Sequence, residues 1–311
     1  MVLAPALVLC LSFGKRPLRF ALGTVALLAS SSFYDGPDGK PLYTDRSFFG
    51  VSRVTTDADK KFHLLFHGST VHGMQNLDTS RSREPLTYYA RTGPIGDVFA
   101  ALQGSNKLQR VAIVGLGAGS LASYGKPDQE FTFYEIDPTV ERIARNVKYF
   151  TFLRDSPAKV NVVIGDARLS LVHAPDAGYG LIILDAFSSD TVPVHLLTRE
   201  AIRLYFSKLT DGGVLAFHIS SRYLDLRPVL GDLAGDANAF CLLGNDSKVS
   251  PAEESAGKEG SLWVVMTRQE KDLSGLVKGS RWTVLTARPE KSPWSDDFSN
   301  IVSVIRPRSL F

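Results

Sequence analysis

Cysteine is scarce in this chain of 311 residues, which contains only Cys10 and Cys241. Two cysteines exclude a disulfide scaffold and a cysteine-based zinc site, and they suit a reducing compartment. A large excess of one charge is also lacking, because 35 basic residues face 32 acidic ones. With 44% apolar and 22% charged residues, the composition excludes a wholly disordered, collagen-like or fully membrane-embedded chain.

The small positive excess lies at one end of the chain. Residues 1–34 contain Lys15, Arg16 and Arg19 and no acidic residue, so they hold the whole formal charge of +3. The other 277 residues carry 32 charges of each sign. A body with balanced charge gives no electrostatic reason to expect a nucleic acid as partner.

No hydrophobic run reaches the roughly 20 apolar residues of an ordinary membrane-spanning helix. Residues 1–13 and 20–33 are both mainly apolar, and the basic sequence GKRPLR separates them. A signal peptide carries its positive charge before the apolar run, whereas here the charge follows it. We therefore predict a membrane-associated segment over residues 1–33, with a cleaved signal and a buried hairpin as alternatives. A start within the last helices of a longer membrane module would explain the short runs.

The next part of the chain is predicted to be a linker followed by a small β domain. Residues 34–46 are rich in turn-forming residues, which is typical of a linker. Residues 47–105 contain short β-branched or aromatic runs punctuated by glycine and aspartate, which indicates antiparallel strands or hairpins. The expected elements are strands at 48–56, 61–67 and 69–75, and a helix over 86–102 that is broken near Gly93.

Residues 106–311 are predicted to form a larger domain of α/β class. Apolar strands that alternate with helices are typical of a parallel sheet covered on both faces. Strands are expected at 110–117, 131–137, 160–166, 180–187, 212–220, 261–268 and 281–287, and helices at 138–150 and 195–209. Residues 245–260 are polar and are predicted to be a mobile loop.

A glycine-rich loop follows the first strand of this domain. Gly115, Gly117 and Gly119 precede a helix, where glycine permits a tight turn and a close approach of the backbone to a ligand. Glu135 lies 20 residues after Gly115, at the end of the second strand, where a carboxylate can accept hydrogen bonds from ribose hydroxyls. Ser120 stands where the dinucleotide fingerprint requires glycine or alanine. The pattern therefore favours a nucleoside site of methyltransferase type over a dinucleotide site.

Two further acids follow the third and fourth strands. Asp166 and Ala167 end the third strand, where an aspartate can hold an adenine amino group. Asp185 ends the fourth strand, and ligands in open α/β sheets bind beyond the carboxyl ends of the strands. A carboxylate at that place can deprotonate a bound ammonium, so Asp185 is the candidate catalytic residue. Ser188 and Asp190 follow it on the same loop.

Four motifs resemble those of the polyamine aminopropyltransferases, the spermidine and spermine synthases. They are VAIVGLGAGSLA, FYEIDPTVERIA, VVIGDAR and LIILDAFSSD, in this order. The resemblance covers about residues 45–245 and is to the bacterial branch in which such a domain follows a transporter-like membrane module. It implies a seven-stranded, methyltransferase-like sheet of Rossmann type, mostly parallel. It also implies aminopropyl transfer from decarboxylated S-adenosylmethionine to an amine, a step of polyamine biosynthesis that releases methylthioadenosine.

The same resemblance implies roles for single residues. Glu135 would bind ribose, Asp166 would bind adenine, and Asp185 would activate the amine. The segment FHGSTVHGMQ lies where the family binds its substrate. The residues expected to contact the substrate are His72, Gln75, Tyr88, Ser188 and Asp190.

Several positions depart from the family pattern. The family has an aspartate where this chain has Ala118, and a second carboxylate where it has Ser188. Gly50 stands at or near the position of an expected glutamine, and Tyr88-Tyr89 replaces a Tyr-His pair. Carboxylates must neutralise the ammonium groups of a polyamine as they lose water. The lost acids therefore weaken the match to a polyamine substrate.

Two alternative functions stay open. One is methyl transfer from ordinary S-adenosylmethionine, which Ala118 favours because an aspartate there would repel the methionine carboxylate. The other is a non-catalytic nucleoside-binding domain that regulates a membrane protein. The expected partners are a small-molecule amine and a membrane, without nucleic acid, and a homodimer is left open. We expect a membrane-associated protein whose catalytic domain lies in the cytoplasm.

The histidines have simpler interpretations. His67 and His72 have no acid beside them in the sequence, so no metal site is expected. His218 follows the fifth strand and is predicted to be structural.

Overall fold

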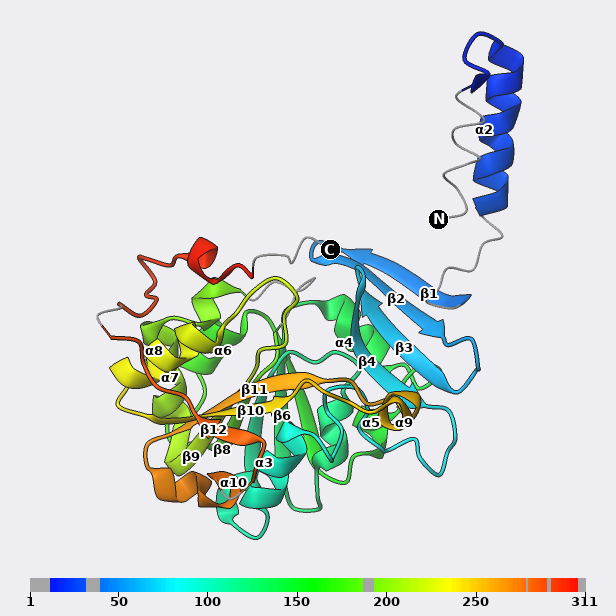
Figure 1. The fold of residues 1–311 in the computed structure, drawn as a ribbon. Coiled ribbons are helices and arrows are strands. Elements are labelled where there is room, and N and C mark those ends of the chain that lie inside the picture. Colours follow the sequence, from blue (N-terminus) through cyan, green and yellow to red (C-terminus); the bar gives the residue numbers. More distant parts are fainter. Residues whose placement is uncertain (1–11, 32–39, 187–192, 278, 290–291, 307–311) are drawn as a thin grey trace.

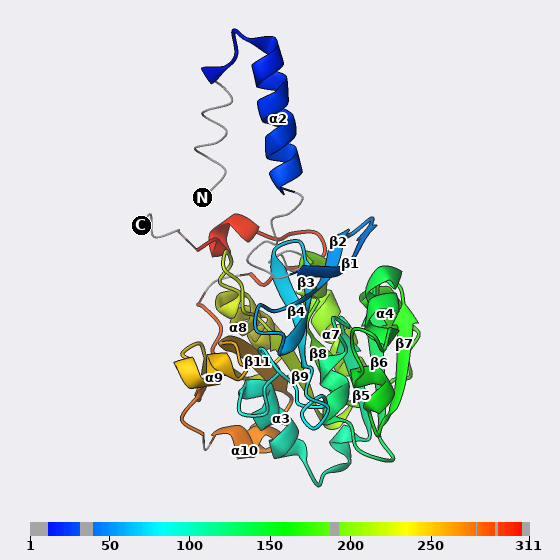
Figure 2. The same cartoon turned by 90° about the vertical axis from the view of Figure 1, so that its right-hand side faces the viewer.

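The computed structural model describes residues 12–31, 40–186, 193–277, 279–289 and 292–306. Their strands form a four-stranded antiparallel sheet and an eight-stranded mixed sheet. The larger sheet lies in the centre of the main body with helices on both faces, and the smaller sheet lies at one end of it (Figures 1 and 2). This arrangement agrees with the predicted α/β class and with the small N-terminal β domain.

The smaller sheet is a meander in which each strand pairs with the next. Its strands are β1 (Lys40–Ser47), β2 (Gly50–Thr56), β3 (Phe62–His67) and β4 (Thr70–Asn76). Gly50 and Gly68 lie at the turns with positive φ angles of 140° and 62°, which glycine tolerates because it has no Cβ. Val54 and Leu65 bury the inner face of this sheet against Phe150 of the main body.

The predicted linker over residues 34–46 is wrong from residue 40 onward. Residues Lys40–Ser47 form β1 and pair with β2, with a shift in register between Pro41 and Tyr43. The turn-rich composition hides this strand because proline is tolerated at the edge of a sheet. The small sheet therefore includes residues 40–46, which were predicted to be part of the linker.

The order of strands in the larger sheet is β12-β10-β11-β9-β8-β5-β6-β7. These strands are β5 (Arg110–Val114), β6 (Glu130–Glu135), β7 (Lys159–Ile164), β8 (Tyr179–Leu184), β9 (Leu209–His218), β10 (Phe240–Asp246), β11 (Ser261–Thr267) and β12 (Trp282–Val284). The five strands from β7 to β9 pair in parallel, and the other three pair antiparallel. All six residues of β8 are buried, as expected for a strand that is covered on both faces.

The larger sheet has eight strands in the described chain rather than the predicted seven. The missed strand is β10, which pairs with β11 on one side and with β12 on the other. Its sequence FCLLGND contains a glycine and ends in polar residues, so it lacks the continuous apolar run of the central strands. Pairing with its neighbours decides its conformation, and a local pattern does not show that pairing.

Helices cover both faces of the larger sheet. The α-helices described in the main body are α3 (Pro94–Leu102), α4 (Pro138–Arg145), α5 (Phe152–Asp155), α6 (Ala167–Val172), α7 (Arg199–Lys208), α8 (Arg227–Asp236), α9 (Pro251–Ser255) and α10 (Ser274–Val277). Helices α6, α7 and α8 share one hydrophobic cluster with the sheet, and α3 and α10 share the cluster on the other face. Ile182 of β8 belongs to the first cluster and Ile183 to the second, because successive side chains of a strand point to opposite faces.

The predicted mobile loop over residues 245–260 contains regular structure. Strand β10 extends to Asp246, and α9 begins with a capping box formed by Ser250 and Glu253. Lys258 is buried, and its Nζ lies 3.0 Å from Asp246 and 2.8 Å from Glu253. The polar composition indicated a loop, but these groups are paired with one another within the fold.

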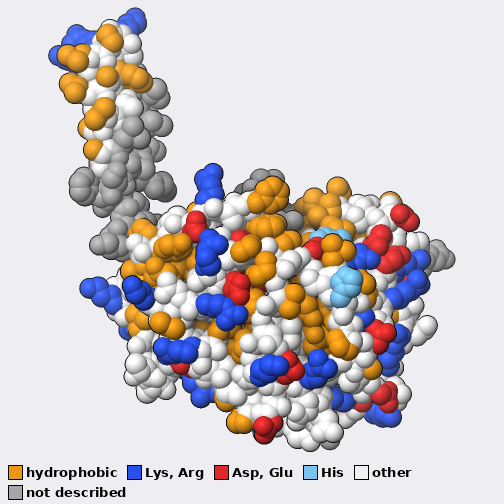
Figure 3. Space-filling model, turned by 180° about the vertical axis from the view of Figure 1, so that it is seen from behind, with side chains coloured by type: hydrophobic (Ala, Val, Ile, Leu, Met, Phe, Trp, Pro, Cys, Tyr) orange, Lys and Arg blue, Asp and Glu red, His pale blue; other side chains and the backbone are white. Residues whose placement is uncertain are grey.

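The described part of the N-terminal segment contains α2 (Pro17–Ser31), which stands apart from the main body in Figures 1 and 2. The side chains of Leu18, Leu22 and Val25 are exposed. Figure 3 shows hydrophobic side chains along this helix and basic ones at its far end. Among the residues that the structure describes, no helix combines the length and the apolar character needed to cross a membrane.

Candidate active site

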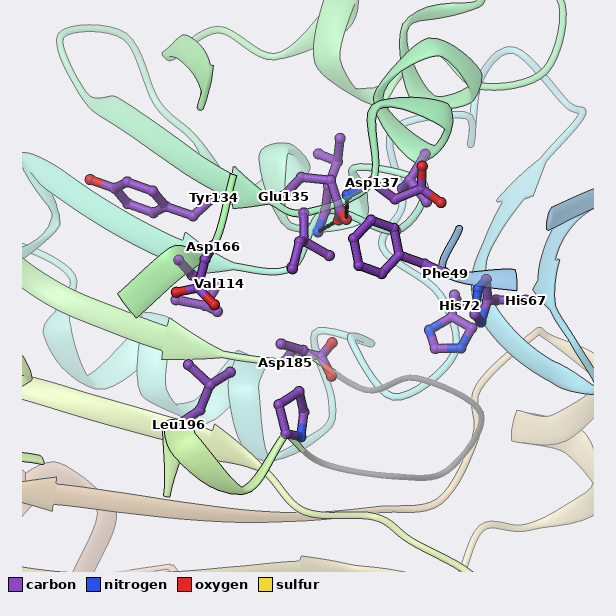
Figure 4. Close-up of a pocket in the computed structure, with 18 of the residues that line it drawn as sticks. Phe49, His67, His72, Val114, Tyr134, Glu135, Asp137, Asp166, Asp185 and Leu196 are labelled. Atoms are coloured by element: carbon purple, nitrogen blue, oxygen red, sulfur yellow. Dashed lines mark hydrogen bonds between the residues drawn. The ribbon is translucent and has the colours of Figure 1, made fainter. Parts of the chain in front are cut away.

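The carboxyl ends of the parallel strands open into a cleft. Strand β5 has β6 on one side and β8 on the other, and a ligand site forms where connections leave neighbouring strands in opposite directions. The cleft encloses about 860 Å³, its open mouth included. Figure 4 shows Glu135, Asp166 and Asp185 around it, with His67 and His72 of the smaller sheet on the other side. The predicted nucleoside-site residues that line it are Gly115, Gly117, Glu135, Asp166 and Ala167.

The glycine loop lies directly against the backbone of two other strands. Gly115 and Gly117 have φ angles of 96° and 53°, which glycine adopts readily. A Cβ at Gly115 would lie 2.3 Å from the carbonyl oxygen of Asp185, and a Cβ at Gly117 would lie 2.4 Å from that of His72. Side chains would therefore push apart the ends of β5, β8 and β4, which the loop brings together.

Glu135 is buried at the end of β6 and supports the glycine loop. Its carboxylate accepts hydrogen bonds from the backbone N–H of Leu116 at 2.9 Å and of Asp137 at 2.8 Å. Burial raises the pKa of Glu135, and the two backbone hydrogen bonds offset part of this rise. The carboxylate also lines the cleft, so a ribose hydroxyl would meet an acceptor that is already held in place.

Asp166 faces the cleft from the start of α6. Its Oδ1 accepts a hydrogen bond from the backbone N–H of Leu169 at 2.9 Å, and its Oδ2 lies 3.2 Å from Nε2 of His195. Such capping satisfies a free N–H of the first helical turn and fixes the carboxylate. Ala167 and His195 line the same part of the cleft. Together these residues form the wall of the cleft where adenine is predicted to bind.

Asp185 lies at the end of β8, and its side chain is only 4% exposed. Its Oδ1 accepts a hydrogen bond from Nδ1 of His218 at 2.8 Å, and its Oδ2 accepts one from the hydroxyl of Tyr89. Burial alone would raise the pKa of Asp185, but the adjacent imidazole and the two hydrogen bonds outweigh burial and lower the pKa below its ordinary value. The predicted catalytic carboxylate is therefore held in its charged form.

His218 connects Asp185 to a second polar group. Its Nε2 lies 2.8 Å from Oγ of Ser220, so a chain of hydrogen bonds runs from Asp185 through the imidazole to the serine. The imidazole stacks on Tyr88 with ring centroids 4.2 Å apart, and it lies 4.9 Å from the ring of Trp263. These aromatic contacts fix the plane of the imidazole. An imidazole held between a carboxylate and a hydroxyl can carry a proton between them.

The predicted substrate-binding residues are only partly brought together. His72 lines the cleft and also a second cavity beside it, and Tyr88 lines the second cavity. Ser188 and Asp190 lie outside the described residues. His72 and Tyr88 therefore mark the boundary between two neighbouring spaces on either side of the Asp185–His218 pair.

Two residues predicted to contact ligands have other surroundings. Gln75 lines neither of the two cavities, because its amide bonds to the backbone oxygen of Ser82 and to the hydroxyl and backbone N–H of Thr151. These bonds join β4 to the segment that precedes α5. Gly119 lies against Leu153, where a Cβ would come within 2.7 Å of the leucine side chain. Both residues shape the site from outside its lining.

Ala118 is closed off from the cleft. It is 1% exposed and belongs to an apolar cluster that includes Leu65 and Phe150. The backbone of Gly73 approaches it so closely that a Cβ at Gly73 would lie 2.4 Å from the Cβ of Ala118. A carboxylate at position 118 would be buried next to this apolar cluster, and a buried charge is costly unless hydrogen bonds compensate it. The surroundings do not fit the aspartate that the aminopropyltransferases carry at this position.

Sequence reasoning missed His218, whose imidazole it assigned a structural role. The signal lies in the register of the sheet, because Leu184 of β8 is opposite Phe217 of β9. The next residues of the two strands are Asp185 and His218, which places these side chains together. Tyr89 comes from an irregular segment before α3, and no local pattern predicts that its hydroxyl reaches Asp185.

Comparisons with known sequences give partial matches. No protein-family model matches the chain. Over 121 residues the chain is 37% identical to a polyamine aminopropyltransferase of Vibrio vulnificus. The matched region covers 37% of this chain and 39% of that protein. Over 119 residues it is 34% identical to an N-terminal histidine N-methyltransferase of Emericella nidulans. This matched region covers 37% of this chain and 20% of that protein. The chain thus spans less than half of the length of these curated relatives.

The fold is similar to that of a solved structure, a probable spermidine synthase from Corynebacterium glutamicum. The TM-score is 0.56 at 16% sequence identity, and the match covers 82% of this chain and 98% of that one. The likeness shows an α/β, methyltransferase-like fold with a small antiparallel N-terminal sheet and a mixed main sheet. The resemblance to polyamine aminopropyltransferases that the motifs indicated is confirmed, while the membrane-fused branch stays a prediction.

Proposed function

We propose that this protein is a spermidine synthase-like enzyme that transfers an aminopropyl group from decarboxylated S-adenosylmethionine to an amine. The observation that carries the proposal is the position of Asp185, which His218 and Tyr89 hold in its charged form beside the nucleoside cleft. The similarity to a polyamine aminopropyltransferase supports the same class of reaction.

The donor fits the cleft through its nucleoside. The fixed carboxylate of Glu135 would accept hydrogen bonds from the ribose, and Asp166 with Ala167 would hold the adenine. The open backbone at Gly115 and Gly117 lets the donor approach the end of β5. These roles leave the sulfonium end of the donor near Asp185, another carboxylate that lines the cleft.

The chemistry needs a positioned nucleophile and a proton acceptor. The acceptor arrives as an ammonium and gives one proton to Asp185, with His218 able to share that proton across the 2.8 Å hydrogen bond. The free nitrogen then attacks the carbon next to the positive sulfur. A carbon–nitrogen bond forms, the carbon–sulfur bond breaks, and its electron pair stays on sulfur in the neutral methylthioadenosine. Asp185 is neutral while it holds this proton and regains its negative charge when the proton passes to His218. That charge then stabilises the substituted ammonium that remains.

Methyl transfer from ordinary S-adenosylmethionine is a second candidate function. The closed position of Ala118 favours it, because the aminopropyl ammonium would find no carboxylate at that position. The partial match to an N-methyltransferase points in the same direction. The reacting carbon and the donor differ between the two functions, but the cleft and Asp185 serve both.

Calorimetry with three ligands tests the proposal. The full chain is titrated with decarboxylated S-adenosylmethionine, with S-adenosylmethionine and with methylthioadenosine. We expect the decarboxylated donor to bind more tightly than S-adenosylmethionine. The reverse order would favour methyl transfer. Binding of all three without turnover of any amine would favour a regulatory nucleoside-binding domain.

We also propose that residues 1–33 attach the protein to a membrane, with the catalytic domain in the cytoplasm. The exposed apolar side chains of α2 support this, since such a helix can lie in the interface of a bilayer. Lys15, Arg16 and Arg19 at one end of that helix would be attracted to anionic lipids. A homodimer stays a prediction.

A further inference from the structure

A second cavity lies beside the nucleoside cleft, on the other side of the Asp185–His218 pair. It encloses about 1190 Å³, its open mouth included, and shares His72 with the cleft. Its inner wall contains Tyr88 and His218, which stack on each other, and Ser220, which bonds to the imidazole. A molecule in this cavity would reach the hydrogen-bonded chain that ends at Asp185.

The lining of this cavity contains more arginine than acidic side chains. Apart from histidine, the described lining residues with ionisable side chains are Arg222, Glu259, Arg306 and the half-buried Tyr88. Glu259 is half-buried, and burial raises its pKa, while the nearby His218 and Arg222 offset part of this rise. A partly desolvated carboxylate gains from a cation that is brought to it. The inner end of the cavity therefore suits an ammonium next to His218.

The two arginines belong to neighbouring segments. Leu224 and Ile305 form an antiparallel bridge, and the backbone N–H of Arg306 donates to the carbonyl oxygen of Tyr223 at 2.7 Å. This pairing keeps the segments of Arg222 and Arg306 together at one cavity. Arg222 is exposed and Arg306 is partly exposed, so both guanidinium groups remain open to solvent and to a ligand. Guanidinium groups bind carboxylates and phosphates with paired hydrogen bonds.

We propose that the second cavity is the acceptor site and that it selects an amine which carries an anionic group, rather than a diamine. This inference rests on the proposed function for its acceptor role. The ammonium would lie beside His218 and near Glu259, where the second cavity meets the cleft. The anionic group would lie at Arg222 and Arg306. A diamine placed in the same way would bring its second ammonium toward two guanidinium groups, and like charges repel.

The acceptor would react by the aminopropyl transfer described under the proposed function, with the same bonds formed and broken. Its nitrogen loses one proton toward the His218–Asp185 pair and attacks the carbon next to the sulfonium. The anionic group takes no part in the bond changes. It positions the nitrogen, because one end of the molecule is held while the other end reaches the cleft.

Two probes of equal length test the charge preference. The full chain, saturated with methylthioadenosine, is titrated with 4-aminobutyrate and with 1,4-diaminobutane, which differ only in the charged group at one end. We expect 4-aminobutyrate to bind at least about tenfold more tightly, the size expected for one charge-assisted hydrogen bond at a partly exposed site. Tighter binding of the diamine, or binding of neither amine, would overturn the proposal.

Variants assign the preference to the arginines. The double variant Arg222→Gln with Arg306→Gln should lose the preference for 4-aminobutyrate, and Arg222→Glu should reverse it toward the diamine. Glu259→Gln should weaken binding of both amines. Arg203→Gln is the matched control, because Arg203 is an exposed arginine on α7 outside both cavities, and its preference should equal that of the parent. An unchanged preference in the double variant would refute the assignment.

The same titrations separate this proposal from the proposed function. Binding of methylthioadenosine by each variant reports on folding and on the nucleoside cleft independently of the amine. If the amines bind with the expected preference but no transfer occurs with any sulfonium donor, the proposed function fails and the selective cavity stands. If transfer occurs and the diamine is the better acceptor, the proposed function stands and this inference fails.

Discussion

Nδ1 of His218 donates a hydrogen bond to Oδ1 of Asp185 across 2.8 Å, at the ends of two adjacent parallel strands. The pair lies between the cleft at the end of β5, which Asp185 lines, and the second cavity, which His218 lines. Neither side chain reaches the other space directly. In the proposed reaction, a proton that leaves an acceptor at the boundary of the two spaces would therefore have a short path through His218 to Asp185.

Replacement of Asp185 by asparagine should slow transfer strongly and leave nucleoside binding nearly intact. Asparagine keeps the size of the side chain and can still accept a hydrogen bond from Tyr89, but it cannot take a proton. A positioned base contributes about 10²–10⁴-fold to a rate, so kcat should fall by that factor. Rapid-quench assays and calorimetry with methylthioadenosine measure the two effects. Asp211→Asn, at an exposed position of β9, is the control.

The comparison has two outcomes that would contradict this role. An Asp185→Asn variant that keeps the parental rate would show that Asp185 is not the proton acceptor. A parallel loss of methylthioadenosine affinity would show that the carboxylate instead holds the nucleoside. Asp211→Asn should match the parent in both measurements.

His218→Gln should lower kcat by about tenfold or more and change its pH dependence. Glutamine can still donate a hydrogen bond to Asp185, but it cannot share a proton, which imidazole does readily near neutral pH. We therefore expect the variant to lose one limb of the pH profile of kcat. His173→Gln, on an exposed side chain after α6, should leave the profile unchanged. A lower rate with the same pH profile as the parent would indicate that His218 acts only through packing on Tyr88 and Trp263.

Because of Glu135, we expect the stability of the fold to fall and the affinity for the nucleoside to rise as the pH increases. Its folded pKa lies above the ordinary glutamate value of 4.5, so the folded chain holds a proton that the unfolded chain has released. The stability from this proton is fully present below the unfolded pKa and is lost as the pH rises through the folded pKa. Affinity for methylthioadenosine should rise over the same window, because only the carboxylate accepts two hydrogen bonds from a ribose.

The variant Glu135→Gln isolates both effects. It should weaken binding of methylthioadenosine at neutral pH by about 1.5–3 kcal/mol, the range for a hydrogen bond to a charged group. Its melting temperature should also lack the part of the pH dependence that Glu135 causes. The same affinity in parent and variant at pH 7 would remove the ribose assignment, and equal pH dependence of melting would show that the pKa is not raised.

Much of the cleft where we propose that a nucleoside binds could be predicted from the sequence. Apolar strands that end in Gly115, Glu135, Asp166 and Asp185 predict one edge of a parallel sheet, because the carboxyl ends of such strands meet. The positions of Tyr89, of β1 and of Gln75 could not be predicted in this way. Tyr89 lies in an irregular segment, and the edge strand β1 contains a proline, so local patterns place neither of them. Gln75 matched a substrate-binding segment by resemblance, yet its hydrogen bonds join β4 to Thr151.

Removal of the apolar N-terminal segment should release the protein from membranes. We expect the full chain to sediment with anionic vesicles, because α2 exposes Leu18, Leu22 and Val25 and has basic residues at one end. A shortened chain that starts at residue 34 keeps β1 complete and should remain in the supernatant with normal binding of methylthioadenosine. If the full chain and the shortened chain both stay in the supernatant as single species, the segment is not a tether.

Ala118 stands where the aminopropyltransferases are expected to carry an aspartate, so this position tests how far the chain departs from that family. Introducing that aspartate with Ala118→Asp should lower the free energy of unfolding by about 3–5 kcal/mol, the cost of an uncompensated buried charge. The reason is the apolar cluster around Ala118 and the close approach of Gly73. Ala118→Asn adds a side chain of the same size without the charge, so the difference between the two variants in urea unfolding isolates the electrostatic part. If Ala118→Asp is as stable as the parent and binds decarboxylated S-adenosylmethionine more tightly, position 118 is open to the cleft and the chain lies one substitution from the family pattern there.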